Sequence, residues 1–163
     1  MFDLKTLSKD AIESALAKAE RYRLLNEPGE AESICLDVLD VDPRNQRAVI
    51  TLLLALTDQF DQRAGAHQRA RDLLKELTAE YDRAYYAGLI AERRAKTHGG
   101  PGALNAGAYE YLMEAMECFG RAEQLHPAGN EDALLRWNAC VRFLRRHPEL
   151  APAPAEREIE MLE

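Results

Sequence analysis

The segment His98-Gly99-Gly100-Pro101-Gly102 is the most glycine-rich stretch of the sequence and the first place to look for chemistry. A loop of this composition could form an oxyanion hole or hold a phosphate group. The first role requires a nucleophilic serine within G-x-S-x-G. The second requires G-x-x-x-x-G-K-[ST], or G-x-G-x-x-G after a strand. None of these patterns occurs in the sequence, so we interpret the segment as a flexible linker.

Four histidines and three cysteines are the remaining candidates for metal binding or nucleophilic catalysis. The histidines form no H-x-x-x-H pair and the cysteines no C-x-x-C pair, so no zinc-site pattern is present. Each cysteine lies in an apolar helical pattern, which is typical of core residues in a reducing cytoplasm. The carboxylates belong to solvated helix faces, and no catalytic pair stands out. We therefore expect no metal, no cofactor and no enzymatic activity. The residues concerned are His67, His98, His126, His147, Cys35, Cys118 and Cys140.

Charge divides the chain into three regions. The formal net charge is −7, and it splits into −5 for residues 1–82, +2 for residues 83–147 and −4 for residues 148–163. This acidity argues against a nucleic-acid partner, because phosphate binding needs clustered lysine and arginine. The basic residues of the middle region form either an ordinary polar helix face or the basic end of a groove that accepts an acidic peptide. They include Arg93, Arg94, Lys96, Arg136, Arg142, Arg145 and Arg146.

Apolar residues at helical spacing predict seven helices and no strand. The first helix should begin near Ser8, the fifth should cover about 82–96, and the seventh should begin near Asn130. The run 48–56 is apolar nearly all round, which places its helix in the middle of a stack. It is too short for a membrane span, which takes about 20 residues. The first residues lack the pattern of a signal peptide, so we expect a cytoplasmic protein.

Three of the predicted helices share a repeated pattern. Ala31-x3-Cys35-x2-Val38-x4-Pro43 aligns without a gap with Ala115-x3-Phe119-x2-Ala122-x4-Pro127, and the fourth helix fits as Ala70-x3-Leu74-x2-Leu77. This pattern resembles the second helix of a tetratricopeptide repeat (TPR) of the small, bacterial type. The resemblance covers about residues 8–147. The corresponding alanines lie 39 and 45 residues apart, whereas the family repeat is about 34 residues. Extra residues must therefore lie near 58–66 and 96–107.

The resemblance implies an all-α, TPR-like solenoid. About three antiparallel helix pairs and a C-terminal closing helix would occupy residues 1–147, followed by a Pro/Ala-rich acidic tail over 148–163. Trp137 would stand at a position where the family has leucine, and we expect it to be largely buried near Phe119. The tail is either a free end or a segment that folds back on the basic residues of the seventh helix.

The resemblance also implies a function. Such proteins commonly act as non-catalytic interaction modules or scaffolds that bind a peptide or a partner protein in the concave groove. A secretion chaperone similar to class II type III chaperones and a small regulatory or assembly subunit of an enzyme complex are the alternatives. We expect a protein or peptide partner, with an acidic peptide as one option, and neither nucleic acid nor membrane; self-association stays open. The groove positions carried over from the family are Glu20, Arg23, Ile50, Leu54, Tyr86, Arg94, Leu135 and Arg142.

Overall fold

The computed structural model describes residues 2–97 and 107–152. Over these residues the chain is all-helical, with seven α-helices and no strand, which confirms the predicted class. Three short 3-10 helices lie at Lys9–Ala11, Leu74–Glu76 and Pro148–Leu150. The α-helices are α1 (Ile12–Leu24), α2 (Pro28–Val41), α3 (Gln46–Thr57), α4 (Ala66–Leu73), α5 (Glu80–Thr97), α6 (Ala108–Leu125) and α7 (Asp132–Arg146).

Local signals in the sequence set several helix ends. Pro28 opens α2, where a missing N–H costs nothing because the first helical amides have no partner in the helix. The Asn45 side chain caps α3 by accepting a hydrogen bond from the Ala48 amide at 3.0 Å. Gly65 precedes α4 with a φ of 82°, a left-handed conformation that glycine adopts without strain. Turns thus divide the chain near the predicted positions, but the fourth helix is shorter than predicted. It ends at Leu73, so Leu74 lies in a 3-10 helix and Leu77 in extended backbone after it.

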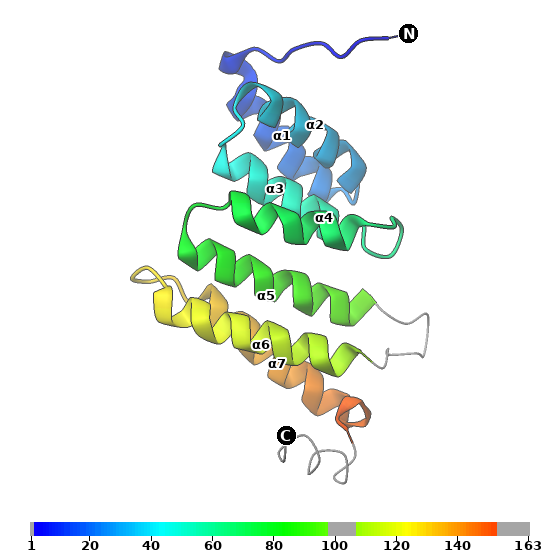
Figure 1. The fold of residues 1–163 in the computed structure, drawn as a ribbon, viewed down its shortest axis with the longest axis vertical. Helices are drawn as coiled ribbons and strands as arrows, with labels where there is room; N and C mark the ends of the chain where they lie inside the picture. The colour runs from blue at the N-terminus through cyan, green and yellow to red at the C-terminus, as the bar shows by residue number, and fades with distance from the viewer. Residues whose placement is uncertain (1, 98–106, 153–163) are drawn as a thin grey trace.

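The helices follow one another as a stack. Figure 1 shows α1 and α2 at the N-terminal end and α6 and α7 at the other end, with α3, α4 and α5 between them. Consecutive helices pack together, and α5 packs most extensively against α6. The odd-numbered helices also touch in sequence, α1 with α3, α3 with α5 and α5 with α7. A row of odd-numbered helices therefore runs along the molecule.

Two large groups of buried side chains form the core. The first joins α1 to α4 and receives Ile90 from α5, and the second joins α5, α6 and α7. The half-buried residues Leu54 and Tyr86 pack against both groups. The run 48–56 lies in α3, and most of its side chains are buried, as its apolar character predicted. Leu54 and Tyr86 thus connect the two halves of the core.

The tight contact between α5 and α6 depends on a glycine. A Cβ atom on Gly88 would lie only 2.7 Å from the Phe119 ring. Phe119 itself is 0% exposed, so its ring has little room to move away. Gly88 is therefore the residue that lets the two helices approach each other.

Some details differ from the sequence prediction. The first α-helix begins at Ile12, because Ser8 precedes a 3-10 turn and its side chain makes no capping bond. Trp137 packs against the second core group but is only half-buried. The reason is that α7 is covered on one face, where Ala133 and Cys140 are the buried residues. The glycine-rich segment 98–102 and most of the predicted tail lie outside the described residues.

Candidate functional site

The eight predicted groove residues lie on the odd-numbered helices, but only some of them come together. Glu20 on α1 bonds to Arg47 of α3, with 2.8 Å between Oε1 and Nε. Leu54 and Tyr86 meet at the boundary of the two core groups, and Ile50 packs against the first group. On α7 the side chain of Leu135 is 59% exposed, and Arg142 is exposed too. The remaining two, Arg23 and Arg94, belong to a cluster of charged residues near the end of α3.

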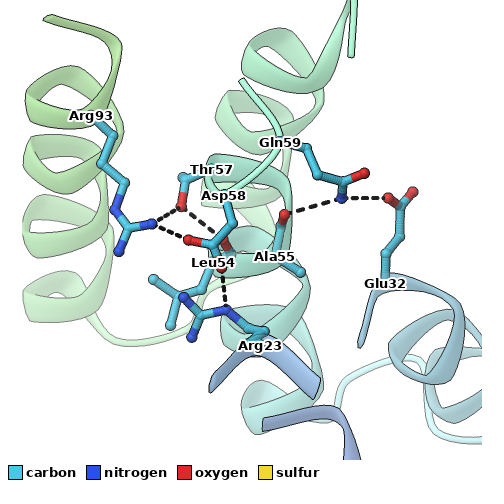
Figure 2. A network of polar contacts seen from close by, with 8 residues as sticks. All are labelled: Arg23, Glu32, Leu54, Ala55, Thr57, Asp58, Gln59 and Arg93. Carbon is cyan, nitrogen blue, oxygen red and sulfur yellow. Dashed lines mark hydrogen bonds and ion pairs between the residues drawn. The ribbon is translucent and has the colours of Figure 1, made fainter. Parts of the chain in front are cut away.

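Asp58, the residue after α3, holds two arginines from neighbouring helices. Its Oδ2 accepts a hydrogen bond from Nε of Arg23 on α1 at 2.8 Å, and its Oδ1 accepts one from Arg93 on α5. Arg93 also donates to the Thr57 hydroxyl at 3.0 Å. Figure 2 shows both guanidinium groups directed at the same carboxylate. One carboxylate therefore ties α1, α3 and α5 together at one end of the row.

A second carboxylate, that of Glu32, also pairs with two arginines. Glu32 of α2 has a side chain only 5% exposed and pairs with Arg63 and Arg69, each at 2.7 Å. Gln59 donates a hydrogen bond from its amide to the same carboxylate at 2.9 Å, as Figure 2 shows. Desolvation raises the pKa of Glu32, but the hydrogen bonds from Gln59 and Arg69, together with the charges of Arg69 and Arg63, outweigh it and leave the pKa below its usual value. Glu32 is therefore ionised at neutral pH.

Glu92 of α5 is the third carboxylate of this kind. Its side chain is 2% exposed and contacts Lys96 one turn further along α5. Arg136 of α7 lies 3.6 Å from its other oxygen. Glu92 thus links α5 to α7, as Asp58 links α1 to α3 and α5.

The three clusters have the same ratio of cations to carboxylates. Each carboxylate is held by two cations, so the three carboxylates face six cations. Every cluster therefore keeps one positive charge in excess. The chain as a whole carries −7, so these three clusters differ in sign from its net charge.

Arg94 adds a further cation beside a pocket of about 480 Å³ at the turn between α3 and α4. Its Nε atom is buried and, among the described residues, makes no hydrogen bond. The acidic side chain in the pocket wall is that of Asp61. The pocket is lined by Phe60, Asp61, Gln62, Arg63, Ala64, Gly65, His67, Gln68 and Arg94.

The opposite end of α3 has the reverse arrangement. There Arg47 bonds to Glu13 at 2.9 Å and to Glu20 at 2.8 Å, so one cation is shared by two carboxylates. The hydrogen bond from Arg47 lowers the pKa of Glu20. This end therefore carries an excess of negative charge.

The protonation states of the buried groups bear on what chemistry they can do. Burial raises the pKa of the Cys35 thiol to about 12 and that of Cys140 to about 11, so both are neutral thiols and poor nucleophiles. Burial also raises the pKa of Tyr86 to about 12. Among residues 2–97 and 107–152, no group of three or more histidine, cysteine or acidic side chains is arranged to hold a metal ion. The charged clusters at Asp58, Glu32 and Glu92 are suited to ionic contacts.

Sequence reasoning identified some of these residues and missed others. It named Arg23 and Arg94 as groove residues and grouped Arg93, Lys96 and Arg136 as basic residues. It did not single out Asp58, Glu32 or Glu92. Glu92 could have been found, because Lys96 follows it at the i,i+4 spacing of a helical ion pair. For Asp58 and Glu32 the partners are far apart in the sequence, and no local pattern marks them.

Comparisons of the chain with models of known families, with curated proteins and with solved structures find no match. Among the described helices, none combines the length and the apolar composition that a membrane span requires.

Proposed function

We propose that this chain is a non-catalytic, TPR-like solenoid that binds an acidic peptide or an acidic segment of a partner protein. The binding surface would follow the row of α1, α3, α5 and α7 toward the carboxyl ends of these helices. The half-exposed apolar residues Ile50, Leu54 and Tyr86 would contact apolar side chains of the partner.

The packing of the repeat positions supports the solenoid. Ala31, Ala70 and Ala115, which align in the repeated pattern, are each 0% exposed. The position seven residues later is buried too, as Val38 in α2, as Leu77 after the 3-10 helix that follows α4, and as Ala122 in α6. The small alanines at the first of these positions let paired helices approach closely. The three free cysteines are buried as well, which fits a reducing compartment such as the cytoplasm.

The observation that carries the proposed ligand chemistry is the excess of cations over carboxylates. Asp58, Glu32 and Glu92 each pair with two cations, so each cluster has one cation more than it has carboxylates. A carboxylate from a partner can pair with one cation of a cluster while the other cation stays paired with the internal carboxylate. Charge complementarity of this kind mainly sets specificity and association rate.

Fluorescence anisotropy with a labelled peptide of alternating Glu and Leu tests the proposal. The comparison peptides carry Gln or Lys in place of Glu. We expect binding of the Glu peptide only, weakened by salt because exposed charges are screened. Equal binding of the Glu and Gln peptides would contradict the proposal.

A charge-matched pair of variants locates the surface. Arg94→Gln removes a guanidinium that makes no ion pair with any of the described residues, and Arg44→Gln removes an exposed one from the turn between α2 and α3. We expect Arg94→Gln to weaken binding of the Glu peptide about tenfold and Arg44→Gln to leave it unchanged. If the two variants behave alike, the carboxyl ends of the row are not the binding surface.

A further inference from the structure

The chain has an extended segment with three large apolar residues before its first helix. Residues 2–8 form no helix, and in Figure 1 this segment leaves the helices at the end of the stack formed by α1 and α2. The side chain of Phe2 is fully exposed and that of Leu4 is 93% exposed. Leu7 is half-buried against the small cluster of Leu16, Val38 and Ala48 and anchors the segment. Two large apolar side chains are thus held away from the chain's own core.

An unfilled groove lies on the outer face of α1. It has a volume of about 550 Å³ and faces away from the buried residues Leu16 and Ala19. A neighbouring groove between α1 and α2 begins at Leu7 and shares Ser14 and Lys18 with it. Leu25 in the wall is 60% exposed. The wall residues are Ser14, Ala17, Lys18, Arg21, Tyr22 and Leu25.

Residues 2–4 of the segment, which precede Lys5, are complementary to the groove in charge and in polarity. The groove offers apolar surface from Ala17, Tyr22 and Leu25, with the cations Lys18 and Arg21 in its wall. The segment places Asp3 between Phe2 and Leu4. Burying the two apolar side chains would therefore bring a carboxylate to the two cations.

We propose that two copies of this chain form a symmetric dimer by exchanging these segments. Phe2 and Leu4 of each copy enter the α1 groove of the other, and Asp3 pairs with Lys18 and Arg21 there. Because both partners of the contact lie on the same chain, one twofold axis produces the contact twice. The span from Phe2 to Leu7 is at most about 17 Å, which is long enough to cross to a neighbouring helix. The contact lies at the α1 face and does not use the cation clusters at Asp58, Glu32 and Glu92.

Sedimentation velocity of the full chain over a concentration series tests the dimer. We expect a reversible monomer–dimer equilibrium in roughly the micromolar range, because two small contacts make an interface at the low end of the usual sizes. Phe2→Ser with Leu4→Ser should weaken association about tenfold or more. The matched control, Leu36→Ser with Met113→Ser, changes two other exposed apolar residues on α2 and α6 and should not. A chain that stays monomeric up to about 0.5 mM, or a dimer that only the control disrupts, would overturn the proposal.

Charge exchange distinguishes this dimer from a segment that folds onto its own chain. One variant carries Asp3→Lys and the other carries Lys18→Glu with Arg21→Glu. Each variant alone should be monomeric, because like charges then meet at both contacts. In an equimolar mixture both contacts pair opposite charges, so heterodimers should form. Circular dichroism checks that both variants are folded. If mixing restores no dimer, or if either variant dimerises alone as the wild type does, the proposed dimer with exchanged segments is wrong.

Discussion

The two ends of α3 carry charge clusters with opposite ratios of cations to carboxylates. At the amino end one cation, Arg47, is shared by the carboxylates of Glu13 and Glu20. At the carboxyl end one carboxylate, Asp58, is shared by the cations of Arg23 and Arg93. Each cluster complements the helix dipole of α3, which favours acids at the amino end and cations at the carboxyl end. The two ends therefore use the same ion-pair chemistry with opposite stoichiometry.

The two clusters differ more in how exposed their side chains are than in the kinds of residues that form them. At the amino end the side chains of Arg47, Glu13 and Glu20 are 42%, 81% and 45% exposed. At the carboxyl end those of Arg23, Asp58 and Arg93 are 19%, 20% and 29% exposed. Exposed ion pairs contribute little because water and salt screen them, whereas a buried charge that loses its partner is costly. The carboxyl-end cluster should therefore stabilise the fold, and the amino-end cluster should mainly set surface charge.

The largest effect is expected for Asp58→Ala. This change leaves the guanidinium groups of Arg23 and Arg93 facing each other with little access to water. We expect a loss of about 3 kcal/mol in the free energy of unfolding, measured by urea denaturation followed by circular dichroism. Glu20→Ala is the matched control at the amino end and should cost much less. Equal losses in the two variants would show that burial does not separate the two ends.

Glu32→Ala tests how far the carboxyl-end cluster extends. Glu32 accepts a hydrogen bond from Gln59, the residue next to Asp58 in the chain, which is 7% exposed and also donates to the Ala55 carbonyl. Removing Glu32 takes one acceptor from Gln59 but leaves the second, and Arg63 and Arg69 can turn to water. We therefore expect a smaller loss of about 2 kcal/mol in the same urea experiment. A double variant with Asp58→Ala should lose the sum of the two if the clusters are independent.

Acid should remove the contribution of Glu32. Its pKa in the folded protein lies below 4.5, so ionised Glu32 contributes stability above that pH. This contribution is lost as the pH falls through the lowered pKa. Glu32→Gln cannot titrate, so the stability gap between wild type and this variant should narrow below about pH 4.5. Urea denaturation at neutral pH and at successively lower pH measures the gap; a gap that stays constant would mean that ionisation of Glu32 contributes nothing.

The sequence predicted the parts of the fold that depend on local signals. Apolar spacing predicted all seven helices, and the apolar character of residues 48–56 predicted that α3 is buried on most sides. Pro28 and Gly65 marked turns because each has its own backbone preference. Trp137 was expected to be more buried than it is, because the apolar pattern of α7 does not reveal that only one of its faces is covered.

The charge clusters were harder to predict, because they depend on contacts between distant residues. Asp58 lies 35 residues from each of its two arginines. Adjacent residues on a helix point in directions about 100° apart, so Arg93 and Arg94 have different neighbours. Arg93 pairs with Asp58, whereas Arg94 faces the turn between α3 and α4. The sequence analysis named Arg94 as a groove position and Arg93 only as one of several basic residues, because no local signal shows which of the two meets Asp58.

The smallest effect is expected for Arg47→Ala. This change removes the cation that Glu13 and Glu20 share, but all three side chains keep contact with water, so both carboxylates are solvated after the change. Any loss of stability should be visible only at low salt and should vanish near about 0.5 M NaCl, where the screening length falls to a few ångströms. The loss in Asp58→Ala should be less sensitive to the same salt concentration, because its cations are less exposed than those at the amino end. Thermal melts of both variants at low and high salt measure this contrast. If salt removes the effect of Asp58→Ala as completely as that of Arg47→Ala, the two ends of α3 differ in the sign of their charge and not in their contribution to the fold.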